Sequence, residues 1–160
     1  MDENELSYKI IGVALELHKS LGPGLLESVY ETALAHDLVE VGLDVKRQVA
    51  LPFVYKNINM EVGYRIDILV NGKVIIEVKA IDALAPVHFA QTLTYLKLSN
   101  LKLALLVNFN VKTLKEGIHR IVNQLYFFAP FANCLCELCV KQIKIRCKTE
   151  KGPKPLSFLS

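Results

Sequence analysis

The sequence of 160 residues is poor in aromatic side chains, which make up 8% of it, and it contains no tryptophan. It therefore lacks an aromatic-rich platform of the kind on which nucleic-acid bases stack. No run reaches the ~18 uninterrupted apolar residues that a membrane helix needs. The N-terminus, Met1 to Glu5, is acidic, whereas a secretory signal begins with basic residues and continues with an apolar run. We therefore expect a cytoplasmic protein with no membrane segment.

Cysteine is absent from the first 133 residues, and the four that follow have the spacing C-x-C-x2-C-x7-C: Cys134, Cys136, Cys139 and Cys147. This spacing does not match the common pairs of zinc ligands. Disulfides are not expected in a cytoplasmic chain. We interpret the four as free thiols, and a bound zinc ion or iron–sulfur cluster is the alternative.

A large excess of positive charge is also missing from most of the chain. Residues 1–140 carry 13 Lys and Arg against 15 Asp and Glu, whereas residues 141–160 carry 6 against one. Charge alone therefore gives no support to nucleic-acid binding by the larger part. Length and composition predict one domain over residues 1–128, followed by a Cys-containing basic tail over residues 129–160.

The spacing of apolar residues predicts eight elements in the order α-α-β-β-β-α-β-α. The helices are expected at 5–20, 25–41, 82–99 and 113–128, and the strands at 43–55, 66–70, 74–78 and 102–109. The strand–helix–strand crossover near the end implies at least one parallel pair. Pro52 favours an edge position for its strand. The fold class is therefore α/β, with a mixed β-sheet flanked by helices.

Two of these strands flank Asn71-Gly72, the strongest short hairpin signal, and both carry acidic residues. Asp67 lies in the first strand, and Glu77 and Lys79 lie on one face of the second. The hairpin would bring the two acids side by side, where they repel each other unless a cation lies between them. Mg2+, or Mn2+ in its place, is usually held by such carboxylates. A solvated strand face is the alternative, but the strands are apolar at nearly every other position.

Further polar residues could join this site. Glu27 borders the apolar face of the second helix, where an inward-facing acid needs a partner, or it is simply favoured there by the helix dipole. Arg65 shares a strand face with Asp67 and could contact a phosphate or form a surface ion pair. The strand presents the carbonyl oxygen of Val78 between Glu77 and Lys79, as a further metal ligand.

A pair of polar residues one helical turn apart, Gln91 and Tyr95, lies in the third predicted helix. His88 precedes Gln91 by three residues and lies near the same face. His88 could contact a phosphate. A polar helix face and a surface histidine are the alternatives.

The motifs resemble those of a known superfamily. Asp67 followed by Glu77-Val78-Lys79 is similar to the signature of the PD-(D/E)XK nuclease superfamily, with Ile66 where that signature has proline. Gly24-Leu-Leu-Glu27-Ser-Val-Tyr30 matches the motif of the GxxExxY protein family, a nuclease-like branch. Gln91-Thr-Leu-Thr-Tyr95 resembles a motif of RecB-type exonucleases. The resemblance covers roughly residues 5 to 125.

This resemblance implies a restriction-endonuclease-like core and a Mg2+-dependent nuclease that hydrolyses phosphodiester bonds, in DNA more than in RNA. It implies that Glu27, Asp67 and Glu77 bind the metal and that Lys79 positions the attacking water. It also implies that Gln91 and Tyr95 lie beside the nucleic acid.

Two other functions stay open. A nucleic-acid-binding or partner-dependent accessory protein would keep the nuclease-like fold with a silent site. A hydrolase or transferase acting on smaller phosphate esters would use similar metal chemistry, but the chain has no phosphate-cradling glycine loop. The apolar stretch at 125–131 would suit a homodimer interface or the buried end of the last helix.

Overall fold

The computed structural model describes residues 1–55 and 58–123, the side chains of 53–62 excepted. Its elements follow in chain order: α1 (Glu3–Leu21), α2 (Glu27–Glu40), β1 (Val45–Tyr55), β2 (Ile58–Val70), β3 (Val74–Lys79), α3 (Pro86–Ser99), β4 (Leu103–Asn108), α4 (Leu114–Gly117) and β5 (Ile118–Val122). The contacts of the chain separate a compact unit, Met1–Tyr126, from Phe127–Ser160.

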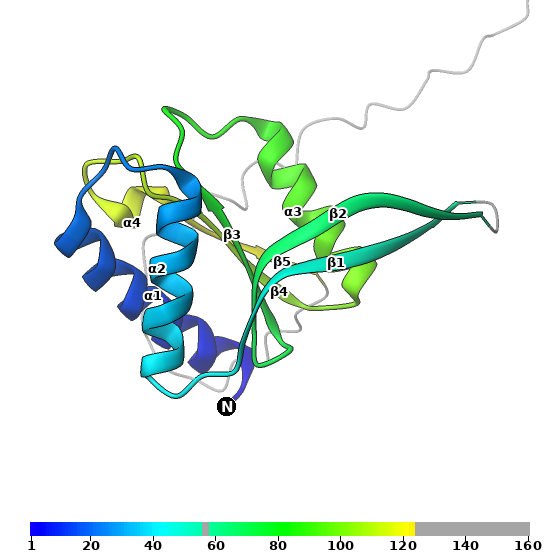
Figure 1. Cartoon of the computed structure of the whole chain (residues 1–160), viewed down its shortest axis with the longest axis horizontal. Coiled ribbons are helices and arrows are strands. Elements are labelled where there is room, and N and C mark those ends of the chain that lie inside the picture. The colour runs from blue at the N-terminus through cyan, green and yellow to red at the C-terminus, as the bar shows by residue number, and fades with distance from the viewer. Residues whose placement is uncertain (56–57, 124–160) are drawn as a thin grey trace, which may run out of the picture. The chain divides into compact units, whose positions relative to one another are not determined.

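The five strands form one mixed sheet in the order β1-β2-β3-β4-β5. Only β3 and β4 are parallel, and α3 connects them, as the predicted crossover requires. The strand that contains Pro52 lies at an edge of the sheet, where a residue without an N–H is tolerated. Figure 1 shows β1 and β2 continuing as a two-stranded ribbon beyond the other strands. The predicted α/β fold, a mixed sheet flanked by helices, is confirmed.

The last predicted helix, over residues 113–128, is wrong within the described part of the chain. Only the four residues of α4 are helical, and β5 follows them directly. Gly117 ends the helix where a Cβ atom would collide with the carbonyl oxygen of Asn108. The chain then pairs antiparallel with β4, with His119 opposite Leu106. Strand pairing over a long sequence distance thus overrides the local helical pattern.

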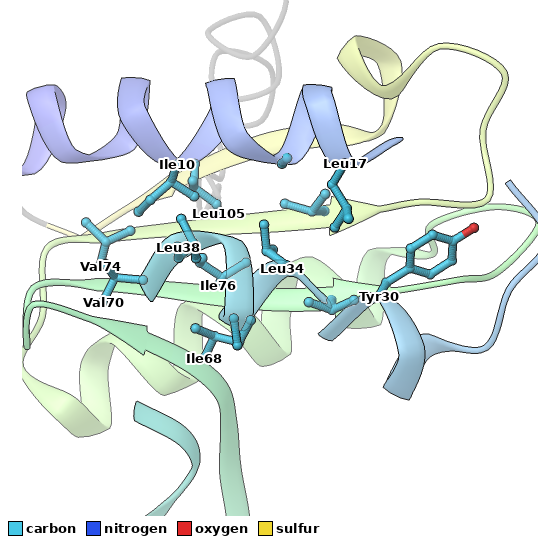
Figure 2. Packing of buried hydrophobic residues seen from close by; sticks show 14 of the residues in the cluster. Ile10, Leu17, Tyr30, Leu34, Leu38, Ile68, Val70, Val74, Ile76 and Leu105 are labelled. Carbon is cyan, nitrogen blue, oxygen red and sulfur yellow. The ribbon is translucent and has the colours of Figure 1, made fainter. Parts of the chain in front are cut away.

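The main core lies between the sheet and the two N-terminal helices. Leu6 and Ile10 of α1 and Leu34 and Leu38 of α2 are fully buried against Ile76 and its neighbours. Figure 2 shows Ile10 of α1 and Leu34 and Leu38 of α2 between these helices and the strands. A second cluster contains the α3 residues Tyr95 and Leu96 together with strand residues. Because both faces of β3 are covered, any charged side chain on this strand is drawn away from water.

The hairpin between β2 and β3 forms as the sequence predicts. Asn71 and Gly72 both have positive φ, at 50° and 62°, as the favoured hairpin turn requires. The N–H of Lys73 donates to the carbonyl oxygen of Val70 at 2.9 Å. The turn therefore sets the register that aligns Ile68 with Ile76 and points the acids of both strands to one end of the sheet.

Several predictions fall on residues outside the described ranges. They are the four cysteines, the apolar stretch at 125–131 with its suggested homodimer interface, and the basic tail at 129–160. No helix of the described residues is long and apolar enough to cross a membrane.

Candidate active site

Lys79 is the centre of a cluster of three carboxylates. Its Nζ atom lies 3.0 Å from Oε1 of Glu77, 3.4 Å from Oε1 of Glu27 and 3.9 Å from Oδ2 of Asp67. The same Nζ donates to the carbonyl oxygen of Val78 at 2.9 Å. The carboxylates come from α2, β2 and β3, and the folded chain brings them to one ammonium group.

Asp67 lies where β2 begins to separate from β3. The last paired residues of the two strands at this end are Ile68 and Ile76. Beyond them, a hydrogen bond to the side chain of Asp67 replaces the pairing between backbones. Its Oδ2 accepts a hydrogen bond from the backbone N–H of Val78 at 3.0 Å. Burial raises the pKa of Asp67, although this hydrogen bond and Lys79 act in the opposite direction. The bond fixes the orientation of the carboxylate.

Glu77 is the most enclosed acid of the cluster, with 2% of its surface exposed. Burial, followed by the negative charge of Asp67, raises its pKa to about 7. Its Oε2 atom is buried and accepts no hydrogen bond from any residue that the structure describes. An unpaired carboxylate oxygen is costly to bury, so this atom is available to a ligand.

Lys79 remains a cation despite its surroundings. Burial lowers its pKa, but the charges of Glu77, Asp67 and Glu27 outweigh this effect and raise the pKa above its ordinary value. With all three acids ionised, two negative charges have no counter-charge within the cluster. Such a cluster favours an additional cation.

Tyr30 holds the loop that delivers Glu27. Its ring is buried and stacks on Phe109 with the centroids 4.5 Å apart. Its hydroxyl donates to the carbonyl oxygen of Gly22 and accepts from the N–H of Leu25. Gly24 has a φ of 101°, which favours glycine, and α2 then starts at Glu27. The glycine and the tyrosine of this motif therefore fix the entry into the helix that carries the acid.

A family model of the PD-(D/E)XK nuclease superfamily matches residues 4–121. The chain belongs to this superfamily. Neither a curated protein nor a solved structure matches it. The match spans all the helices and strands described above except the last residue of β5 and the first residue of α1. The restriction-endonuclease-like reading of the fold thus agrees with the family.

As a PD-(D/E)XK protein, the chain would be expected to hold a divalent metal ion in this cluster. Within residues 1–55 and 58–123, no three His, Cys, Asp or Glu side chains are arranged as a ready metal site. The ammonium of Lys79 lies within 3.9 Å of an oxygen of each of the three carboxylates. The buried Oε2 of Glu77 and the excess of negative charge nevertheless fit a hard cation with oxygen ligands.

Gln91 and Tyr95 form a pair on α3, and they lie near the cluster. The side-chain amide of Gln91 donates to the hydroxyl of Tyr95. Burial raises the pKa of Tyr95, and the charges of Glu77 and Asp67 add to the effect. Because only 4% of Tyr95 is exposed, its ring belongs to the core and its hydroxyl is the part close to the acids.

His88 and Arg65, the other predicted contacts, have different surroundings. The Nδ1 atom of His88 accepts a hydrogen bond from the N–H of Ala85, so this histidine caps the start of α3. Arg65 is exposed on β2, opposite Ala50 of β1, and its side chain makes no hydrogen bond or ion pair with a described residue. The first residue has a local structural role, and the side chain of the second is exposed to solvent.

The sequence analysis missed a polar cluster beside the carboxylates. Glu31, one turn after Glu27 on α2, is 7% exposed and binds Arg47 and Gln48 of β1. Its charge is one of those that raise the pKa of Asp67. Its position four residues after Glu27 was a signal in the sequence, since the two acids share a helix face.

Proposed function

We propose that this protein is a Mg2+-dependent nuclease that hydrolyses phosphodiester bonds, in DNA more than in RNA. The supporting observation is the convergence of Glu27, Asp67 and Glu77 on Lys79, with one oxygen of Glu77 buried and unpaired. Superfamily membership supports nuclease activity in general, and the geometry of this cluster supports its dependence on a metal ion.

Asp67, Glu77 and the carbonyl oxygen of Val78 would hold the Mg2+ ion, or Mn2+ in its place, with Glu27 completing the set. A bound divalent ion supplies Lewis acidity at the scissile phosphate and favours the deprotonation of water. The Nζ atom of Lys79 lies within 3.9 Å of one oxygen of each of these acids, so the lysine would share the carboxylates with the ion.

Lys79 has two tasks in this mechanism. Its raised pKa keeps it protonated, so it donates hydrogen bonds and does not abstract a proton at neutral pH. It would orient the attacking water and offset the charge that builds on the phosphate oxygens. Without a metal, its positive charge also lowers the repulsion among the three carboxylates, which stabilises the folded site.

The test is cleavage of labelled single-stranded and duplex DNA, and of RNA, with Mg2+ or Mn2+ against EDTA. We expect cutting that needs the metal and is lost in Glu27→Ala and Glu77→Gln. Glu40→Ala is the matched control, because Glu40 is an exposed acid at the other end of α2. It should cut like the wild type.

The opposite result would favour the accessory role. Residues 1–140 have 13 basic against 15 acidic side chains, which suits a protein that meets nucleic acid only with a partner. Folded wild type that leaves DNA and RNA intact at all metal concentrations would count against the nuclease.

A further inference from the structure

Arg47 of β1 is held in a fixed orientation by α2. Its Nε atom donates to Oε1 of Glu31 at 3.0 Å, and its Nη2 donates to Oγ1 of Thr32 at 2.9 Å. The other oxygen of Glu31 accepts from the side-chain amide of Gln48 at 2.8 Å. Two neighbouring residues of the helix thus accept hydrogen bonds from one guanidinium group.

This group lies beside the carboxylate cluster. Arg47 is paired with Ile68 of β2, and Val49 is paired with Ile66, so the residue between them, Gln48, lies across from Asp67. Gln48 has a φ of 51°, a conformation that a non-glycine residue rarely adopts within a strand. Such a residue marks a local distortion of β1 next to the site.

Among the residues that the structure describes, the guanidinium of Arg47 has acceptors for only some of its donors. A guanidinium carries five N–H groups, and Glu31 and Thr32 accept from two of them. The side chain of Arg47 is 40% exposed, whereas that of Glu31 is only 9% exposed. The remaining donors therefore have access to a ligand from solvent, and the buried acid holds the group in place.

We propose that Arg47 binds a phosphate of the nucleic-acid backbone next to the scissile one, and that Glu31 and Thr32 orient it for this task. The inference rests on the proposed nuclease function. Arginine matches the geometry of phosphate oxygens, and an arginine already held in place loses less conformational entropy on binding. Arg65, whose side chain has no such partners among the described residues, should contribute less.

The test measures DNA affinity by fluorescence anisotropy over a series of salt concentrations. Ca2+ replaces Mg2+, under conditions where the wild type leaves the labelled duplex intact. Arg47→Gln should weaken binding about tenfold, as expected for loss of a charged hydrogen bond. The slope of log affinity against log salt should fall by about 0.9, the value for one phosphate contact on duplex DNA. Arg65→Gln is the matched control and should change both quantities less.

A double variant separates phosphate binding from a structural role. Arg47→Gln leaves the buried Glu31 without its ionic partner, which lowers the melting temperature. In Glu31→Gln/Arg47→Gln that unpaired charge is gone, so the melting temperature should recover while DNA binding stays weak. Recovery of the affinity in the double variant would overturn the inference, because Arg47 would then act only by neutralising Glu31.

Two further results are decisive. An unchanged salt slope in Arg47→Gln would also overturn the phosphate contact. A wild type that binds no DNA or RNA would overturn this inference together with the proposed function. Failure of the inference alone appears in the variants, while the wild type still binds and cuts.

Discussion

The parallel strands β3 and β4 are nearly equal in burial but differ in how their polar groups are satisfied. Each has six residues, and Glu77 of β3 lies opposite Leu106 of β4. The polar residue of β4, Asn108, donates to the carbonyl oxygen of Ile81 and accepts from two backbone N–H groups. Glu77, by contrast, keeps one oxygen without a partner in the described residues.

Burial of a polar side chain therefore does not by itself mark a site. Asn108 is as buried as Glu77, at 2% exposure each, yet the chain meets the hydrogen-bonding needs of its amide. It joins the loop after β3 to the end of β4, which is a structural role. Glu77 lies among other acids, and its Oε2 atom has no partner among the described residues, so its burial carries an energetic cost that a bound cation would relieve.

The largest expected effect comes from making β3 resemble β4. Glu77→Leu should reduce cleavage by at least about 10³-fold, the scale seen when an essential charged group is lost. It should also raise the free energy of unfolding at pH 8 by about 1–3 kcal/mol, because a buried charge is replaced by an apolar group. Cleavage assays and urea unfolding measure the two quantities.

Leu106→Ala is the matched control on the neighbouring strand. It creates a cavity and should lower the free energy of unfolding by about 2–5 kcal/mol while cleavage per folded molecule is kept. Cleavage that survives in Glu77→Leu would show that the reaction takes place elsewhere in the protein.

Lys79→Met tests the charge balance of β3, since it removes the cation and keeps most of the side-chain volume. Cleavage should fall about 10²- to 10⁴-fold, within the range for groups that orient water or offset charge. The melting temperature in EDTA should also fall, because three carboxylates then face each other, and Mg2+ should restore it. Cleavage within a few-fold of the wild type would remove the lysine from the mechanism.

The smallest effect is on stability as a function of pH. The pKa of Glu77 is raised from 4.5 to about 7 in the folded protein, so the folded state holds a proton that the unfolded state releases between these values. The free energy of unfolding should therefore fall, by on the order of 2 kcal/mol, as the pH rises through this window. Asp67, whose pKa is also raised, acts in the same direction. Urea unfolding in EDTA at several pH values measures this change in the free energy of unfolding. A wild type whose free energy of unfolding stays constant with pH, as in Glu77→Leu, would contradict the prediction.

Much of the cluster could be predicted because its signals are local. The turn at Asn71 and Gly72 sets the hairpin register, and this register brings Asp67 toward the strand that carries Glu77 and Lys79. The buried, apolar character of both strands further indicated that these charges would meet each other. Glu27 required the family resemblance, since its distance from Lys79 depends on how α2 packs.

Other features depend on tertiary contacts that no local pattern shows. The apolar spacing after Thr113 favours a helix, but pairing with β4 turns residues 118–122 into a strand. The hydrogen bond between Arg47 and Glu31 requires β1 to pass beside α2, which the sequence does not show. The left-handed conformation of Gln48 could not be predicted either, because the residue is not a glycine. Gly117 was a usable warning, because a glycine within a predicted helix weakens it.

The contact between Glu27 and Lys79 joins residues that are 52 positions apart, and it has a consequence for biosynthesis. The acid on α2 leaves the ribosome long before the lysine does. The strand that carries the lysine, β3, can pair with β4 only after synthesis has passed Asn108, the last residue of β4. Such non-local pairings form late and together. The complete set of three acids around Lys79 is therefore assembled only when the domain is almost complete.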